Sequence, residues 1–313
     1  MTRKVVVLAV YIFVFLTGLP INFLAFYSFL KKVREKALPI DILLLNLTIS
    51  DLFHLIILPV KMVEVALDNT WPLPDFLCPL ALFIFHSSIY LSTLFLMGVS
   101  VERYLCIAYP VKHKLNHRPT YTKVASLFFW FLACSHCLGI AYGIEYSDRT
   151  AKKDGPNSTC YNNFPTSQLQ IVLTTRLEVC IVLFLIPFII TLFCYIRVIR
   201  ILSSMPNIKP QKKQRAVALA LATVLIFSLA FAPYNISHLV GFIEGKNSTW
   251  RMETFVFTSL NTILDPVIFF FSSATIRQDV TNYWLHIRSS IRSPDFRICC
   301  NTPNANGKGE GDA

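Results

Sequence analysis

The chain has 313 residues, of which 54% are hydrophobic and only 15% are charged. Soluble domains carry about a quarter charged residues, so this composition excludes an ordinary soluble protein and indicates a lipid bilayer as the solvent. The formal net charge of +11 does not indicate nucleic-acid binding, because the basic residues lie in short connections between apolar runs. No phosphate-loop or zinc-hydrolase motif occurs, which argues against an enzyme.

A helix that crosses a bilayer needs about 20 mostly apolar residues. Seven runs meet this requirement; the second, Leu43–Val60, is interrupted by Asp51, and the seventh, Thr254–Ile276, is interrupted by Asp265. The sequence therefore predicts an all-α membrane protein, a seven-transmembrane helix bundle formed by residues 1–273. Its spans are 5–30, 40–64, 76–108, 121–144, 169–202, 212–243 and 251–272. The first run is too long for a cleaved signal peptide and is read as a retained helix.

The connections between spans differ in charge according to their side of the membrane. Every odd-to-even connection is basic, with residues such as Lys31, Lys112 and Lys213, as expected of a cytoplasmic face. The amino terminus is then extracellular, in a multi-pass protein of the plasma membrane. The remaining connections hold the glycan-acceptor residues Asn157 and Asn247, which fit this orientation.

Two of the nine cysteines stand apart from the apolar runs. Cys78 opens the third span at the outer face, and Cys160 lies in the long outer loop 145–168. Both are in the oxidising compartment, where a disulfide persists. We predict a Cys78–Cys160 bridge that holds this loop over the mouth of the bundle as a lid.

The segment after the last span alternates apolar and basic residues at helical spacing. This pattern predicts an amphipathic eighth helix over 274–293 on the inner membrane surface. Residues 294–313 are polar and rich in glycine and asparagine, which indicates a disordered tail. Cys299 and Cys300 within it are candidates for acylation.

Polar residues inside the spans require a partner, because an ionisable group in a bilayer is costly. Asp51, Ser92, Asn261 and Asp265 lie at comparable depths in three spans. Two carboxylates so close together need a shared proton or a cation. We predict a sodium ion at these four residues, and no other cofactor; the alternative is a network of hydrogen bonds with water.

Glu102-Arg103-Tyr104 at the inner end of the third span places an acid beside a base. Further polar, aromatic and proline positions in the other spans are Asn22, Asp51, Trp130, Pro187, Tyr195, Pro233, Asp265 and Pro266. With these residues the chain resembles the rhodopsin-like, class A G-protein-coupled receptors over all seven spans. The resemblance implies that Arg103 leaves a local pairing with Glu102 to contact a heterotrimeric G protein, and that arrestin is a further partner.

Two positions depart from the pattern of that family. Phe269 replaces the usual tyrosine after Asp265-Pro266, and Phe231 replaces the usual tryptophan of the sixth span. The aromatic switch and the tyrosine-water contacts that these residues provide in the family are therefore in doubt here.

The outer halves of the spans contain five basic side chains, namely His86, His136, Arg176, His238 and Arg251. Two arginines that approach one cavity are unstable neighbours unless a carboxylate or another anion neutralises them. A guanidinium binds a ligand carboxylate or phosphate through two parallel hydrogen bonds. The alternative is that Glu145 and Glu253 pair with these arginines structurally.

Several short motifs narrow the class of ligand. Thr175-Arg176-Leu177-Glu178, Trp250-Arg251 and the run from Pro233 to His238 resemble the short-chain free fatty acid receptors. The resemblance implies that acetate, propionate and butyrate are agonists and that Gi/o and Gq proteins are partners. Arg176 and Arg251 would bind the carboxylate, His238 and Tyr234 would donate to it, and His136 and Tyr90 would limit the depth of the cavity. His86 departs from the family, which more often has an aromatic ring there. The rival ligands are another small anionic metabolite or a longer fatty acid.

Overall fold

The computed structural model describes residues 2–68, 71–74, 76–116, 119–151, 160, 166–206, 210–248, 250–272 and 285. The chain divides into two compact units, Met1–Ile276 and Arg277–Ala313. Every regular element in the described part of the first unit is helical. The predicted eighth helix and tail fall almost entirely outside the described residues and stay predictions, as does acylation of Cys299 and Cys300.

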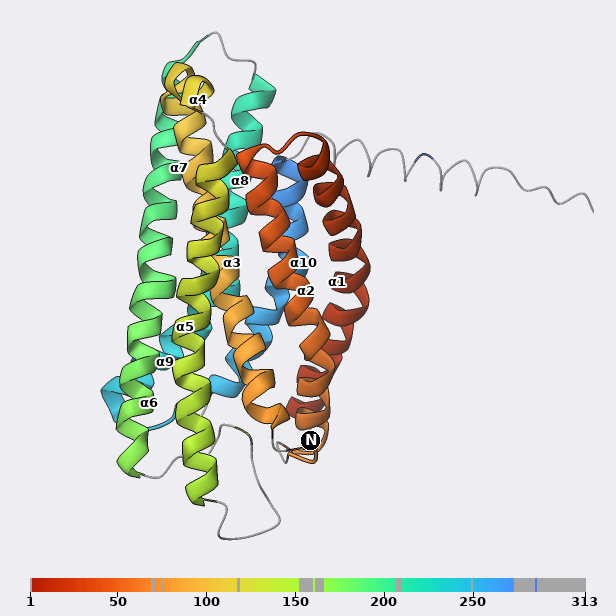
Figure 1. The fold of residues 1–313 in the computed structure, drawn as a ribbon, viewed down its shortest axis with the longest axis vertical. Coiled ribbons are helices and arrows are strands. Elements are labelled where there is room, and N and C mark those ends of the chain that lie inside the picture. Colours follow the sequence, from red (N-terminus) through yellow and green to blue (C-terminus); the bar gives the residue numbers. More distant parts are fainter. Residues whose placement is uncertain are drawn as a thin grey trace, which may run out of the picture. The chain divides into compact units, whose positions relative to one another are not determined.

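The first half of the chain forms four long helices and one short one. The bounds are Thr2–Glu35 for α1, Pro39–Ala66 for α2, Leu77–Ala108 for α3, Pro110–Asn116 for α4 and Pro119–Ala151 for α5. Figure 1 shows the long helices side by side, with α4 at the end of the bundle where α3 finishes. Helices α1, α2 and α5 extend the predicted spans by a few residues, α3 begins one residue later than predicted, and the sequence analysis missed α4 altogether.

The second half of the chain forms three further spans, two of which contain a π-helical turn. The fifth span consists of α6 (Thr166–Val179), a π turn η1 (Cys180–Leu185) and α7 (Ile186–Ser204). The sixth consists of α8 (Pro210–Ile226), η2 (Phe227–Phe231) and α9 (Ala232–Glu244), and α10 (Arg251–Ser272) is the last. Pro187 and Pro233 follow the two π turns, where the missing proline N–H interrupts the regular α-helical bonding.

Hydropathy agrees with this arrangement for six of the helical segments. Within the described residues, six helical segments are long and apolar enough to cross a membrane. They are α1, α2, α3, the first part of α5, the continuous span from α6 to α7, and the span from α8 to α9. The last helix, α10, does not meet the same threshold and carries Arg251, Glu253 and Asp265. All of its charged groups except Glu253 are at most 2% exposed, so its polar face lies inside the bundle.

Buried polar side chains join the helices. Asn22 of α1 donates through Nδ2 to the carbonyl of Thr262 in α10 at 2.7 Å. Trp130 of α5 donates through Nε1 to Asn46 Oδ1 of α2 at 2.9 Å. In an apolar surround, such hydrogen bonds fix which helix faces meet, since an unsatisfied polar group is costly there.

Thr93 of α3 supplies a donor where the fifth span is interrupted. Pro187 has no N–H for the carbonyl of Leu183, four residues before it. The Thr93 hydroxyl donates to this carbonyl at 2.6 Å and also lies 2.7 Å from the carbonyl of Tyr90. Thr93 therefore fastens the centre of α3 to the π turn.

Replacing Thr93 with valine should destabilise the protein. Valine has nearly the same shape but no hydroxyl, so the Leu183 carbonyl loses a buried donor, at a cost of roughly 0.5–2 kcal/mol. The measurement is thermal unfolding of the purified protein in detergent. Thr93→Ser keeps the hydroxyl and is the matched control; equal melting temperatures for the valine variant and the native protein would contradict the assignment.

Candidate ligand-binding site

Arg176 lies near the end of α6, and its side chain faces the interior of the bundle. Only 2% of the residue is exposed. Its Nη1 donates to Asn247 Oδ1, in the connection between α9 and α10, at 2.7 Å. Glycosylation of Asn247, which would use the Nδ2 atom, stays a prediction, and Asn157 lies outside the described residues.

Arg251 enters the same outer region from a different helix. It is the first residue of α10 and is also 2% exposed. Its guanidinium carbon lies 5.6 Å from the centre of the Phe255 ring, one helical turn further along. The first turn of α10 thus turns Arg251 inward and supports it on an aromatic face.

The two arginines converge on the same two histidines. Arg176 and Arg251 both interact electrostatically with His238 of α9 and with His86 of α3. Each histidine is 2% exposed. Four helices therefore bring two guanidinium groups and two imidazole rings into one buried region at the outer end of the bundle.

Tyr234 connects these groups. Its hydroxyl lies 2.9 Å from His86 Nε2, and its ring centre lies 4.3 Å from that of His238 and 4.5 Å from that of Phe255. His86 Nδ1 is bonded to the carbonyl of Leu82 at 2.8 Å. In a neutral His86 the proton is therefore on Nδ1, and Tyr234 donates its hydroxyl proton to Nε2. This bond fixes Tyr234 toward α3.

His136 and Tyr90, the two residues expected to limit the cavity, are both held within the bundle. His136 Nε2 lies 3.0 Å from Glu178 Oε1, so this pair joins α5 to α6. Tyr90 of α3 is 1% exposed. Glu178, which the sequence analysis did not pair, is thus the partner of His136.

Of the two acidic residues proposed as structural partners of the arginines, the structure describes the side chain of Glu253. Glu253 forms an ion pair with Arg3 at 2.7 Å, at the outer ends of α10 and α1. The side chain of Glu145 lies outside the described residues. The structure thus gives Glu253 a partner other than the two buried arginines.

The predicted disulfide is confirmed. Cys78 at the start of α3 and Cys160 are bonded, with their Cα atoms 5.9 Å apart. Most of the loop around Cys160 lies outside the described residues. The bond nevertheless connects that loop to α3 two turns before His86.

The four residues predicted to hold sodium are brought together. Asn261 Nδ2 donates to Asp51 Oδ1 at 3.3 Å, Ser92 Oγ lies 3.5 Å from the same oxygen, and the Asp51 and Asp265 carboxyl groups interact electrostatically. The Asp265 carboxyl is within side-chain hydrogen-bonding reach of Asn261 and Asp51, so the four residues form one buried polar cluster. Carboxylate, amide and hydroxyl oxygens are the ligands that hard cations prefer, so these residues fit such an ion.

His54 is a buried polar residue that the sequence analysis missed. Its Nδ1 lies 3.1 Å from Ser88 Oγ of α3, and its Nε2 lies 2.9 Å from Ser259 Oγ of α10. Its ring also packs on Phe85 with centres 4.4 Å apart. The available signal was an isolated histidine one turn after Asp51 in an otherwise apolar run.

The end of the bundle where α3 finishes contains a second group of predicted residues. Glu102 Oε1 lies 3.0 Å from His113 Nε2 of α4, a partner that the sequence did not reveal. Arg103, Glu102 and His113 line a cavity of about 390 Å³. Tyr104 packs edge to face on Phe193 of α7, with centres 6.0 Å apart.

Three further residues that the sequence analysis selected, Tyr195, Asp265 and Pro266, lie within the bundle. The Tyr195 hydroxyl of α7 lies 3.1 Å from Thr223 Oγ1 of α8. Asp265 and Pro266 are inside α10, where Asp265 is fully buried.

Comparison with known proteins identifies the family. The profile of the 7 transmembrane receptor (rhodopsin family) matches residues 21–269, which include most of α10. The chain is 45% identical to free fatty acid receptor 2 of Mus musculus over 289 residues, covering 92% of this chain and 87% of the relative. It is 46% identical to free fatty acid receptor 2 of Homo sapiens (88% and 84% covered) and 44% identical to free fatty acid receptor 3 of Rattus norvegicus (85% and 82% covered). The chain is therefore a multi-pass membrane receptor, not an enzyme, and belongs to the free fatty acid receptors within the rhodopsin family of G-protein-coupled receptors.

Proposed function

We propose that this receptor is activated by short-chain carboxylates, namely acetate, propionate and butyrate, with Arg176 and Arg251 binding the carboxylate. The observation that carries the proposal is the convergence of these two buried arginines, from α6 and α10, on His238 and His86. An anion between them reduces the repulsion of like charges in a low dielectric. The relatives named free fatty acid receptors support a fatty acid as that anion.

We propose a small ligand because the side chains linked to the two arginines, His86, His238 and Tyr234, are themselves almost fully buried. Tyr90, His86 and Tyr234 are each at most 2% exposed, and His136 is held by Glu178. A ligand of about four or five heavy atoms gains at most ~1.5 kcal/mol per atom, or about 6–7 kcal/mol. This corresponds to a dissociation constant of roughly tens of micromolar at best. The receptor is therefore suited to a metabolite present at high concentration.

A dose series of straight-chain carboxylates from one to six carbons tests the proposal in transfected cells. We expect responses to the two-, three- and four-carbon acids and a loss of potency for the six-carbon acid, because the longer chain exceeds the space beside the carboxylate. Inhibition of cAMP formation and release of calcium are the readouts. A six-carbon acid more potent than propionate would contradict the proposal and favour a longer fatty acid, while silence toward every acid in the series would favour another anionic metabolite.

The proposed orientation and partners follow from the charged cytoplasmic end. The amino terminus is extracellular, and Arg103 and His113 beside the inner cavity face Gi/o and Gq proteins, with arrestin as a further partner. The same cAMP and calcium assays distinguish the G-protein types when cells are treated with pertussis toxin, which blocks only Gi/o.

A sodium ion at Asp51, Ser92, Asn261 and Asp265 is part of the proposed function. If it stabilises the inactive receptor, replacing sodium by choline at constant ionic strength should raise agonist potency by roughly fivefold or more. Asp51→Asn removes a carboxylate of the site and should abolish this sodium dependence. Asp41→Asn is the matched control, since Asp41 lies on the same helix but pairs with Lys32 at 3.5 Å. Sodium dependence that persists in Asp51→Asn would contradict the site.

A further inference from the structure

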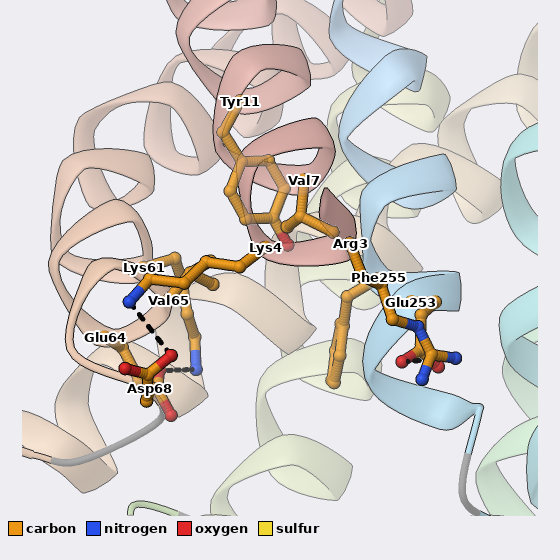
Figure 2. Close-up of a pocket in the computed structure, with 10 residues that line it drawn as sticks. All are labelled: Arg3, Lys4, Val7, Tyr11, Lys61, Glu64, Val65, Asp68, Glu253 and Phe255. Carbon is orange, nitrogen blue, oxygen red and sulfur yellow. Dashed lines mark hydrogen bonds and ion pairs between the residues drawn. The ribbon is translucent and has the colours of Figure 1, made fainter. Parts of the chain in front are cut away.

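A second cavity opens at the outer end of the bundle, apart from the paired arginines. It has a volume of about 290 Å³ and lies between the outer ends of α1, α2 and α10. Figure 2 shows Tyr11 of α1, Glu64 of α2 and Phe255 of α10 on different sides of it. Ligand sites begin at about 300 Å³, so this cavity matches one small molecule.

Three ion pairs line this cavity. Arg3–Glu253 at 2.7 Å and Lys4–Asp68 at 2.9 Å are the outer pairs, and at least one side chain of each is largely exposed. Lys61–Glu64 at 2.8 Å is the inner pair, with the side chains only 8% and 1% exposed. The six charges sum to zero, so the cavity has both signs of charge on its wall and no net charge.

The inner pair leaves one strong acceptor available. Glu64 Oε2 is bonded to Lys61, whereas the buried Glu64 Oε1 accepts no hydrogen bond from any residue in the described part of the chain. A buried carboxylate oxygen without a donor is costly. The phenol of Tyr11, which is 3% exposed, interacts electrostatically with Glu64 and lies on the same wall. The cavity therefore favours a ligand that brings an N–H donor to Glu64.

Charge balance determines what else that ligand must carry. A simple cation at Glu64 would add a positive charge beside Lys61 without compensation, and a simple anion would displace a buried carboxylate from Lys61. A zwitterion avoids both costs, since its ammonium reaches Glu64 while its carboxylate reaches Lys4 or Arg3 on the rim. The apolar walls formed by Val7, Val65 and Phe255 accommodate a hydrocarbon side chain.

We propose that this cavity is a second ligand site, which binds a free α-amino acid with an apolar or aromatic side chain. The Phe255 ring is a wall of the cavity and also packs against Tyr234 and His86, with ring centres 4.5 Å and 5.7 Å apart. An amino acid bound on one side of Phe255 therefore alters the arginine site on the other side. This coupling, unlike the binding itself, rests on the proposed function.

Binding of tritiated L-phenylalanine to the full-length receptor in lipid nanodiscs tests the site directly. We expect saturable binding at millimolar concentration. Phenethylamine and 3-phenylpropionate each keep only one of the two charges, so they should compete at least roughly tenfold less well than unlabelled L-phenylalanine. Absence of saturable binding, or equal competition by either analogue, would overturn the proposal. A failed response to short carboxylates leaves this test intact, because it does not depend on the agonist.

Two variants locate the binding within the cavity. Val7→Trp fills the space, and Lys61→Gln/Glu64→Gln removes the inner pair without leaving a buried charge; both should lower phenylalanine affinity roughly tenfold or more. Two matched controls should retain native affinity. Ile12→Trp adds the same bulk on the exposed side of α1, and Glu244→Gln/Lys246→Gln removes an exposed ion pair whose atoms lie 3.4 Å apart. Native affinity in both cavity variants would show that phenylalanine binds elsewhere.

The functional consequence is measured in the same cells as the carboxylate series. We expect L-phenylalanine to change propionate potency by roughly fivefold or more in the native receptor and to have no effect in Val7→Trp. Direct binding without any change in propionate potency would retain the site and overturn the coupling through Phe255.

Discussion

Replacing Arg176 with alanine is expected to abolish activation by propionate at every accessible concentration. The variant removes one of two buried guanidinium groups that we assign to the ligand carboxylate. Truncating one partner of a buried, hydrogen-bonded charge pair costs about 2–5 kcal/mol, or roughly 30-fold to several thousandfold in affinity. Since the whole binding energy of such a small acid is about 6–7 kcal/mol, little affinity remains. Dose-response curves for cAMP inhibition measure this loss.

Two comparisons make this result specific to the ligand. Arg176→Lys keeps the charge but loses the planar, two-pronged donor, so it should retain a weakened response. Lys246→Ala removes a cation from the same outer end, where Lys246 is exposed beside Glu244, and should respond like the native receptor. Surface expression must be equal for all variants. Unchanged propionate potency in Arg176→Ala would exclude the proposed carboxylate site.

Removing the disulfide should have the second large effect. Cys78→Ala leaves Cys160 unpaired and frees the outer loop from the start of α3. Loss of a native disulfide typically costs 2–5 kcal/mol, although the entropic account of this effect is model-dependent. We expect much less receptor at the cell surface and a lower melting temperature for the fraction that folds.

The double variant Cys78→Ala/Cys160→Ala separates loss of the bond from the effect of a free thiol. It should behave like Cys78→Ala, because both lack the same cross-link. Cys106→Ser is the matched control, since Cys106 is an exposed free cysteine near the end of α3. Normal surface expression of the double variant would show that the bond is dispensable for folding.

Most of the architecture was predictable from the apolar runs, although the last helix, α10, falls below the hydropathy threshold that the other six segments meet. Each run from 5–30 to 251–272 became a helix, since a backbone in a bilayer must satisfy its own hydrogen bonds. The short helix α4 was not predicted because it lies outside the apolar runs, where the signal is weak. The π turns η1 and η2 were missed as well, although Pro187 and Pro233 mark their positions.

The sequence identified those residues of the candidate site whose charged or titratable side chains are costly to place in a bilayer. Arg176, Arg251 and His238 were selected from the sequence as charged or titratable groups in apolar spans, and all three are buried. Their roles toward a ligand stay predictions. The pairing of Glu102 with His113 was not predicted, because it depends on which helix faces are in contact. Those contacts cannot be read from a single sequence.

The π turns of the fifth and sixth spans divide each of these spans into an outer and an inner segment. Arg176 is on the outer segment of the fifth span, while the inner segments carry Tyr195 and Thr223, whose hydroxyls are 3.1 Å apart. A helix interrupted in this way bends more easily there than elsewhere. We therefore expect the outer and inner segments of these two spans to change their relative angle at η1 and η2, so that the proposed binding of an anion beside Arg176 shifts the segments that carry Tyr195 and Thr223.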